Sequence, residues 1–322
     1  MDFLSSFSSS LPGALAQGLV WGIMAIGVFI TYKVLDVADL TVDGSICTGG
    51  AVCVVLITNG VPVQLALLAA FGAGVLAGIM TGLFHTACGI PVLLAGILTQ
   101  LALYSINLRI MGWGTSAGSK ANLPISVDKY NLLISARNVL SAGLNNPIAV
   151  LLIFVAILVA LLYWFFGTEL GSSLRATGSN ENMARAQGIN TNFTKVLGLA
   201  LSNGIVALAG ALLAQYQGFA DINMGRGSIV IGLAAVIIGE VLLGKIFRNF
   251  ALRLLSAVVG AIIYYIVIQF VLRLGLSTDD LKLLSSLVVA VFLAVPYWKS
   301  RIVQPHKQKP SEPKTPTTSE AA

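Results

Sequence analysis

Leu170–Lys195 reads LGSSLRATGSNENMARAQGINTNFTK, a polar and charged stretch between two long apolar runs, Ile148–Phe166 and Val196–Tyr216. A run of about 20 apolar residues is long enough to cross a bilayer as a helix. The polar stretch therefore connects two membrane spans. We expect a polytopic, all-α membrane protein in which the connection 167–195 has a structure of its own.

A short helix is predicted inside this connection. Asn180 or Ser179 can cap its N-terminus, because a short polar side chain accepts a hydrogen bond from the first free backbone amides of a helix. The body of the helix is Glu181–Gln187. Glu181 and Arg185 stand at i and i+4, in the order that stabilises a helix.

The end of this helix is also marked in the sequence. Gly188 occupies the position where a glycine commonly stops a helix, and Ile189 can fold back as its hydrophobic partner. Asn190, Thr191 or Asn192 can cap the next helix, which enters the bilayer. A helix delimited in this way between two spans indicates a docking site for a partner; the simpler alternative is an ordinary interfacial loop.

The composition fixes the class of protein. The 322 residues are 57% hydrophobic and only 10% charged, with a mean hydropathy of +0.89. A soluble domain has roughly a quarter of its residues charged, so this is a membrane protein. The formal net charge of +6 bears on membrane topology rather than on nucleic-acid binding. Met1–Leu11 lacks the basic residues of a cleavable signal, so we expect the first apolar run to remain as a span.

The apolar runs predict the number of spans. Runs of spanning length lie near 14–34, 63–84, 90–108, 147–166, 196–217, 250–273 and 281–298. Two shorter runs, 44–57 and 227–244, either cross as broken helices or re-enter the membrane. Counting both gives about nine transmembrane helices in a domain of residues 1–298. Residues 299–322 are rich in Pro, Lys, Thr and Ser and are predicted to form a disordered cytoplasmic tail; alternating the spans from this tail places the N-terminus outside.

Similar polar segments precede the two shorter runs. Asp39–Ile46 reads DLTVDGSI and matches Asp221–Ile229, DINMGRGSI, with one residue inserted. We name these the first and second polar segments. Upstream, Gly22-Ile23-x-Ala25 matches Gly204-Ile205-x-Ala207 at an offset of 182 positions. The matches predict an internal duplication.

The duplicated halves are expected at about 14–108 and 196–298. Because an odd number of predicted spans separates the copies, the halves are inverted relative to the membrane. Inverted repeats with interrupted helices are how many transporters build a central pathway.

Both polar segments place charges at the ends of apolar helices, where a charge is costly unless it meets water, a partner or a cavity. The candidates for a substrate pathway are Asp39, Thr41, Asp43, Ser45, Asp221, Asn223 and Ser228. Capping explains the same residues, since Asp43 or Thr41 can cap the 44–57 helix. Both roles remain open, and one residue can have both. Asn107 and Arg109 are further polar candidates, which we interpret as marking the membrane interface.

Two motifs resemble a known family. The run Arg175-Ala176-x-Gly178-x-Asn180, followed by Ala184-Arg185-x-x-Gly188-Ile189-Asn190, is similar to the cytoplasmic coupling loop of permeases of the branched-chain amino acid and ribose ABC importers. The first polar segment resembles an Asp-Leu-Ser-Val-Gly-Ser run of the ribose-type permeases. Here Asp43 is additional, which suggests a different ligand or a local ion pair.

The resemblance implies a permease subunit in the bacterial inner membrane that works as a homodimer. Its partners would be a cytoplasmic ATP-binding subunit and an extracytoplasmic substrate-binding protein. ATP would be hydrolysed by the partner, so no cofactor is expected in this chain. The residues implied in ATPase coupling are Arg175, Asn180, Glu181, Met183, Ala184, Arg185, Gln187 and Gly188.

Within this superfamily the chain looks most similar to permeases of tryptophan or tyrosine uptake, then to those for branched-chain amino acids, then to those for ribose or nucleosides. The expected function is therefore ATP-driven import of an amino acid, with a sugar or nucleoside importer permease and an ATP-independent secondary transporter as alternatives. An enzyme is not expected, because the sequence has no phosphate-binding Gly-x-x-x-x-Gly-Lys-Ser/Thr loop, no metal-ligand cluster and no nucleophile with a base.

Overall fold

The computed structural model describes residues 3–115, 118–127, 129–130, 132–139, 146–244 and 249–273, and a few single residues between 283 and 294. Its helices are α1 (Phe3–Phe29), α2 (Val42–Thr58), α3 (Val63–Thr86), α4 (Val92–Met111), α5 (Pro147–Gly167), α6 (Glu169–Ser179), α7 (Glu181–Ala186), α8 (Thr191–Gln217), α9 (Ser228–Leu243) and α10 (Phe250–Arg273). Two short strands, β1 (Asn122–Pro124) and β2 (Phe219–Asp221), complete the described elements.

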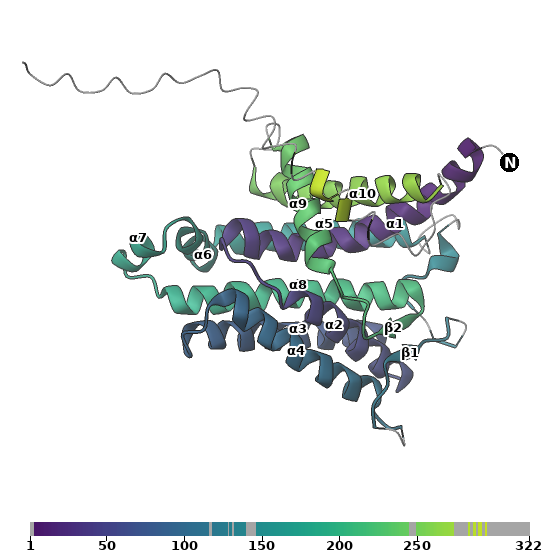
Figure 1. The fold of residues 1–322 in the computed structure, drawn as a ribbon, viewed down its shortest axis with the longest axis horizontal. Coiled ribbons are helices and arrows are strands. Elements are labelled where there is room, and N and C mark those ends of the chain that lie inside the picture. Colours follow the sequence, from purple (N-terminus) through teal and green to yellow (C-terminus); the bar gives the residue numbers. More distant parts are fainter. Residues whose placement is uncertain are drawn as a thin grey trace, which may run out of the picture.

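The long helices lie side by side in one bundle, with α6 and α7 projecting from one end and the two strands at the other (Figure 1). Six helices are long and apolar enough to cross a membrane: α1, α3, α4, α5, α8 and α10. Helices α2 and α9 are shorter and apolar, and they correspond to the two shorter apolar runs of the sequence, 44–57 and 227–244. The multi-pass helical fold is confirmed, whereas the predicted span 281–298 lies largely, and the tail 299–322 wholly, outside the described residues.

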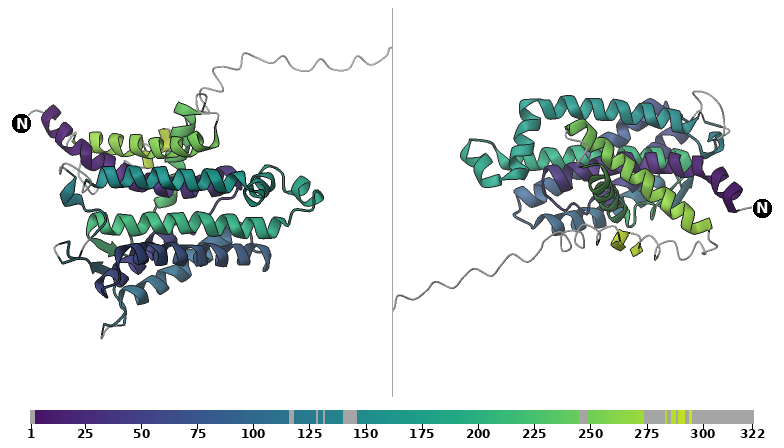
Figure 2. Two further views of the ribbon diagram at one scale, coloured as in Figure 1. Left: turned by 180° about the vertical axis from the view of Figure 1, so that it is seen from behind. Right: turned by 90° about the horizontal axis from the view of Figure 1, so that it is seen from above.

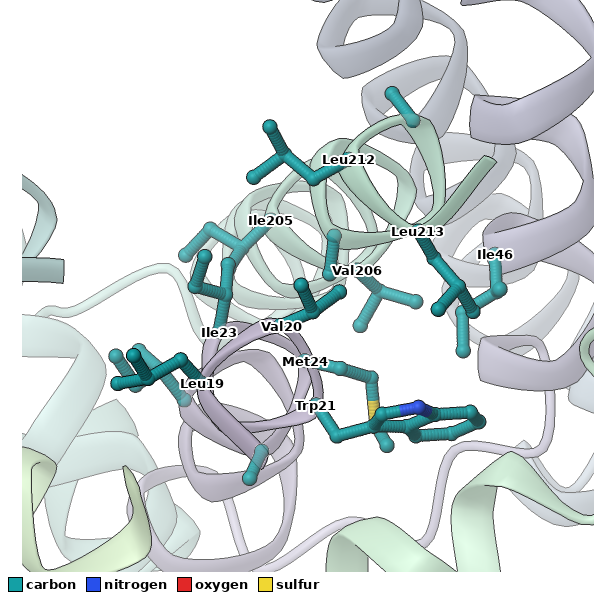
Figure 3. Close-up of a cluster of buried hydrophobic side chains, with 14 of the residues drawn as sticks. Leu19, Val20, Trp21, Ile23, Met24, Ile46, Ile205, Val206, Leu212 and Leu213 are labelled. Carbon is teal, nitrogen blue, oxygen red and sulfur yellow. The ribbon is translucent and has the colours of Figure 1, made fainter. Parts of the chain in front are cut away.

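Helices α1 and α8 form an antiparallel pair at the centre of the bundle. The Tyr216 hydroxyl approaches the Gly13 carbonyl oxygen at 3.5 Å at one end of the pair. The Ser202 hydroxyl donates to the Gly27 carbonyl oxygen at 2.8 Å towards the other end. The buried side chains of the two helices fill the space between them (Figure 3). The first turns of α1 thus lie at the end of the bundle opposite α6 and α7, as Figures 1 and 2 show.

The chain breaks its helical path directly after α1. A π-helical turn, Ile30–Val34, ends the helix, and Asp36 follows with a φ of +55°. The chain then returns towards the middle of the bundle before α2 begins at Val42. The first polar segment is therefore a break between α1 and α2, as the sequence predicted.

The glycines of the predicted repeat make equivalent contacts in the two halves. A Cβ atom at Gly22 of α1 would overlap Val258 of α10. A Cβ atom at Gly204 of α8, the matching position, would overlap Val75 of α3. Small residues allow membrane helices to approach closely, and here they do so in the same way twice. The pairing of α1 with α10 and of α8 with α3 supports the inverted duplication; the exact bounds of the halves stay a prediction.

The segment between α4 and α5 contains a pairing between distant parts of the chain. In the structure β1 pairs antiparallel with β2, with Leu123 opposite Ala220, and a short 3-10 turn follows at Ala136–Asn138. The pairing partner lies about a hundred positions away in the sequence, so local propensity could not reveal it.

Candidate functional site

The first polar segment is held by a buried hydrogen-bond network. Asp39 Oδ1 accepts from the backbone N–H of Thr41 at 2.9 Å, and Asp39 Oδ2 accepts from Asn203 Nδ2 at 2.6 Å. Asn203 Oδ1 in turn accepts from the Ser45 hydroxyl at 2.6 Å. All four residues are buried. Asn203 of α8 thus fixes both the break and the start of α2.

This network continues through hydroxyl groups into the neighbouring helices. Thr41 Oγ1 lies 2.7 Å from Thr81 Oγ1 of α3, and Thr81 Oγ1 donates to Thr99 Oγ1 of α4 at 2.8 Å. A buried polar group is costly unless it is hydrogen-bonded, and these side chains satisfy one another. Of the predicted pathway residues, Asp39, Thr41 and Ser45 therefore lie inside the bundle with partners from the chain itself.

The second polar segment repeats the local geometry of the first. Asp221 Oδ1 accepts from the backbone N–H of Asn223 at 2.7 Å, which is the same i to i+2 turn that Asp39 makes with Thr41. Asp221 Oδ2 accepts from Asn122 Nδ2 of β1 at 3.2 Å. Unlike Asp39, Asp221 is only half-buried and Asn223 is exposed. These two residues are accessible to a solute.

Asp43 joins the two polar segments. Its Oδ2 accepts from the backbone N–H of Gly227 at 2.9 Å, and its Oδ1 accepts from the Ser228 hydroxyl at 2.7 Å and from the backbone N–H of Ile229 at 3.0 Å. Helix α9 has no side-chain cap of its own. The expected capping by Asp43 is thus found, but on α9 rather than on its own helix.

A cavity of about 260 Å³ opens beside this junction. It is lined by Asp43, Gly44, Cys47, Gln100, Leu101, Tyr104, Asn107, Ile222 and Arg226. The sequence reasoning missed Gln100, Tyr104 and Arg226. It placed Asn107 at the membrane interface, but Asn107 is only 1% exposed and faces the bundle; spacing along α4 alone does not tell which side of the helix is covered.

A larger cavity, of about 1090 Å³, lies at the end of the bundle near α6. Its wall contains an ion pair between Lys33 and Glu240, with Nζ and Oε2 2.7 Å apart. This pair connects the end of α1 to the end of α9. The side chains of Lys33 and Glu240 are 36% and 52% exposed, so the pair adds little to stability.

Helix α7 begins at Glu181 as predicted and ends at Ala186, one residue before the predicted end. Asn180 caps it, accepting from the Met183 N–H at 3.0 Å. At the other end, Gly188 has a φ of +82°, and the Ile189 N–H donates to the Ala184 carbonyl oxygen at 3.1 Å. This is the glycine-terminated arrangement expected from the sequence. Asn190 caps α8.

Glu181 ties α7 to the rest of the chain. Its carboxylate pairs with Arg185 at 2.9 Å, as predicted, and also with Lys195 of α8 at 2.7 Å. The hydrogen bond from Lys195, with the positive charges of Lys195 and Arg185, lowers the pKa of Glu181 below its ordinary value. Arg185 donates further to the Thr191 hydroxyl at 3.1 Å. These contacts attach the short helix to the start of α8.

One residue of the predicted coupling set is not accessible on α7. Met183 is 58% exposed, but Ala184 is only 1% exposed and packs inward. The other exposed residues of this segment are Asn182, Arg185, Ala186 and Gln187, and Met183, Ala186 and Gln187 form its least polar part. Arg175 lies on α6, a helix that was not predicted, and its guanidinium donates to the Phe166 carbonyl oxygen at 2.9 Å.

Comparison with known proteins identifies the family. A family model described as "Branched-chain amino acid transport system / permease component" matches residues 10–296. The chain belongs to this family. It is a multi-pass membrane permease of the ABC importer type rather than an enzyme, and location in a bacterial cell membrane fits. The resemblance seen in the sequence is confirmed.

Individual relatives cover most of the chain. A tyrosine transport system permease protein of Clostridioides difficile (strain R20291) is 41% identical, over 89% of this chain and 91% of the relative. The ribose import permease protein of Escherichia coli (strain K12) is 23% identical, over 89% and 85%. Among solved structures, an inward-facing ABC transporter assigned to the metal-chelate type has a TM-score of 0.51 at 16% identity, covering 90% of this chain and 85% of that one. That likeness concerns the fold alone.

Proposed function

We propose that this chain is the membrane subunit of an ATP-driven importer for an amino acid, with an aromatic amino acid as its preferred solute. The observation that carries the substrate class is the 41% identity to a tyrosine transport system permease, over 89% of this chain. A sugar is the second candidate, favoured by the ribose permease and by a galactofuranose transporter permease of Escherichia coli (strain K12), which is 27% identical over 80% of this chain and 71% of the relative.

In this proposal the exposed face of α7 enters a cleft on a cytoplasmic ATP-binding subunit. Met183 is a flexible apolar side chain that adapts to such a cleft, with Ala186 and Gln187 beside it. ATP is hydrolysed by that partner, and no nucleotide binds here. Two copies of this chain form the permease, and an extracytoplasmic binding protein delivers the solute.

Contacts within the chain support a mechanical route from α7 to the polar segments. Lys195 of α8 holds Glu181 of α7, and Thr194 of α8 lies 2.9 Å from Thr177 of α6 between their hydroxyl oxygens. Farther along α8, Asn203 holds Asp39. A displacement of α7 by the ATPase is thereby passed along α8 to the break that begins α2.

The pathway follows the accessible residues of the junction. Asp43, Asp221 and Asn223 are assigned to its wall because they are partly or fully exposed. Asp39, Thr41, Ser45 and Ser228 are buried and are assigned to the scaffold that shapes it.

The test is uptake by proteoliposomes that contain this chain, its ATPase and its binding protein. We expect uptake of radiolabelled L-tyrosine only when ATP is present on the side of the membrane that holds the ATPase. Unlabelled ribose should not reduce this uptake. Uptake of ribose instead would favour the sugar importer. Tyrosine flux through vesicles holding this chain alone would favour a secondary transporter.

A further inference from the structure

The cavity of about 260 Å³ beside Asp43 has no role in the proposed route from α7 to the polar segments. It lies where α2 begins, against the middle of α4, and its remaining wall comes from the second polar segment. Its volume is just below the roughly 300–1,000 Å³ of pockets for drug-sized ligands. A solute of metabolite size fits this scale.

Two opposite charges stand at equivalent places in its wall. Asp43 precedes Gly44-Ser45-Ile46, and Arg226 precedes Gly227-Ser228-Ile229 in the second segment. Both line the cavity. The carboxylate of Asp43 already accepts three hydrogen bonds from the start of α9.

Arg226 is in a different situation. Its side chain is exposed, and among the described residues it forms no ion pair, with Asp43 or with any other carboxylate. Its exposed side chain lines the cavity, so the cavity presents an available cation.

Asn107 supplies a second available group. It is 1% exposed, and its Nδ2 donates to the Gly44 carbonyl oxygen at 3.4 Å. Its Oδ1 is buried and has no hydrogen-bond partner. Buried acceptors are nearly always paired, so an unpaired one in a cavity wall points to a donor supplied from outside the chain.

We propose that this cavity binds the zwitterionic head of an amino acid in transit. Arg226 binds the α-carboxylate, and Asn107 Oδ1 accepts a hydrogen bond from the α-ammonium group, which the Asp43 charge also attracts. Leu101 and Tyr104 of α4 form the apolar and aromatic wall for the side chain. The opposite charges of the wall match a zwitterion, whereas a neutral sugar needs neither. This assignment rests on the proposed function and makes the permease itself selective.

The experiment uses the complete transporter in proteoliposomes, with L-tyrosine as the probe. We expect Arg226→Gln and Asn107→Leu each to raise the KM of uptake at least tenfold, while ATPase association stays normal. Arg226→Lys should recover part of the affinity, because it keeps the positive charge. Arg109→Gln is the control, since Arg109 is an exposed arginine of the same helix as Asn107 that does not line the cavity.

A direct measurement separates this site from the binding protein. The permease–ATPase complex without binding protein should bind L-tyrosine in equilibrium dialysis. Neither tyramine, which lacks the carboxylate, nor 3-(4-hydroxyphenyl)propionate, which lacks the ammonium group, should compete. Tyrosine uptake with unchanged KM in both Arg226→Gln and Asn107→Leu would overturn the cavity assignment alone. Uptake of ribose and of no amino acid would overturn this assignment together with the proposed substrate.

Discussion

The carboxylate of Asp43, at the start of α2, caps the start of α9 and accepts a hydrogen bond from the Ser228 hydroxyl at 2.7 Å. The two residues come from the two predicted halves of the chain and lie 185 positions apart. A cap normally lies next to its own helix. Here the cap of one broken helix is supplied by the other, so the two breaks are joined into one structural unit.

Replacing Asp43 should reveal this connection. Asp43→Asn loses the charge and one acceptor but keeps one capping oxygen, so we expect the free energy of unfolding to fall by about 1 kcal/mol and solute uptake to decrease. Thermal unfolding in detergent and uptake in proteoliposomes measure the two effects. The matched control is Asp36→Asn: Asp36 is exposed, and its positive φ suits asparagine as well. If Asp43→Asn and Asp36→Asn had the same unfolding temperature and the same uptake, Asp43 would have no structural role.

Asn223 distinguishes a pathway role from a capping role. Its side chain is exposed, and only its backbone N–H binds Asp221. We therefore expect Asn223→Leu to leave the melting temperature unchanged and to reduce uptake, because the substitution changes only the wall of the path. Normal uptake by this variant would exclude Asn223 from the pathway.

Asn203→Leu should be among the most destabilising substitutions in the chain. It leaves Asp39 Oδ2 without its donor and the Ser45 hydroxyl without its acceptor, both buried. Each unsatisfied buried group costs about 1–3 kcal/mol, and a charged group costs more. We expect a loss of roughly 3 kcal/mol or more by the same principle. Ser202→Ala, which removes one neutral hydrogen bond one residue away, should cost only about 1 kcal/mol; similar losses for the two variants would mean that the network is not cooperative.

Local signals in the sequence were enough to predict α7 in detail. Asn180 caps it and Gly188 ends it, because caps and glycine stops depend on a few adjacent residues. The internal duplication was also predicted from the sequence, and its two aspartates, Asp39 and Asp221, form the same local turn in the structure. What the sequence could not show was orientation. Ala184 packs inward because of the neighbouring helices rather than because of its own spacing.

The cavity could not be predicted for a similar reason. Asn107 and Arg226 lie more than a hundred positions apart in the sequence and meet only through tertiary packing. The extra Asp43 was noticed as a departure from the ribose-type pattern, yet its partners lie on α9. A sequence pattern identifies such residues as unusual, but not what they contact.

The pH dependence of α7 should follow Glu181. Its pKa in the folded protein lies below the ordinary value of 4.5, chiefly because of the hydrogen bond from Lys195. The contribution of the ionised Glu181 carboxylate to the stability of the folded protein is therefore complete above pH 4.5. It is lost as the pH falls through the lower pKa of the folded state. A spin label at Asn182, in a background without the exposed Cys88, should stay immobilised from pH 7 to pH 5 and become mobile in more acidic solution. With Glu181→Gln the label should be mobile throughout; a label equally immobile in that variant would contradict the role of the ion pairs.

Topology can be tested with single cysteines. The first turns of α1 lie at the end of the bundle opposite α7 (Figure 2), so a cysteine at Ser6 should react with an impermeant maleimide in intact cells. Cysteines at Asn59 and Gln187 serve as controls for the outer and inner ends, again without Cys88. If α2 were part of a re-entrant hairpin, the N-terminus would be inside, and the Ser6 cysteine would react only after lysis.

The docking face of α7 gives the most direct test of coupling. Met183 is a large apolar side chain of this helix that is 58% exposed, and a carboxylate there would be buried in the apolar cleft that we propose on the ATPase. We expect Met183→Glu to give a folded, membrane-inserted protein that loses its ATPase on purification and transports nothing. Ala184→Glu should instead disturb α7 itself, since Ala184 is buried within the chain. Gly188→Val should act similarly, because a β-branched residue at a φ of +82° is strained by about 1–2 kcal/mol.

The matched control is Trp113→Glu. Trp113 is 77% exposed and follows α4 at the opposite end of the bundle, so the same change of charge there should leave the ATPase bound. Pull-down of the ATPase with each variant, beside a thermal melt of the permease, separates loss of docking from loss of folding. Recovery of the ATPase with Met183→Glu at the wild-type level would mean that α7 is not the docking element. The route from Glu181 of α7 along α8 to Asn203 would then carry no motion from the ATPase, and the coupling part of the proposal would fail while the family assignment stood.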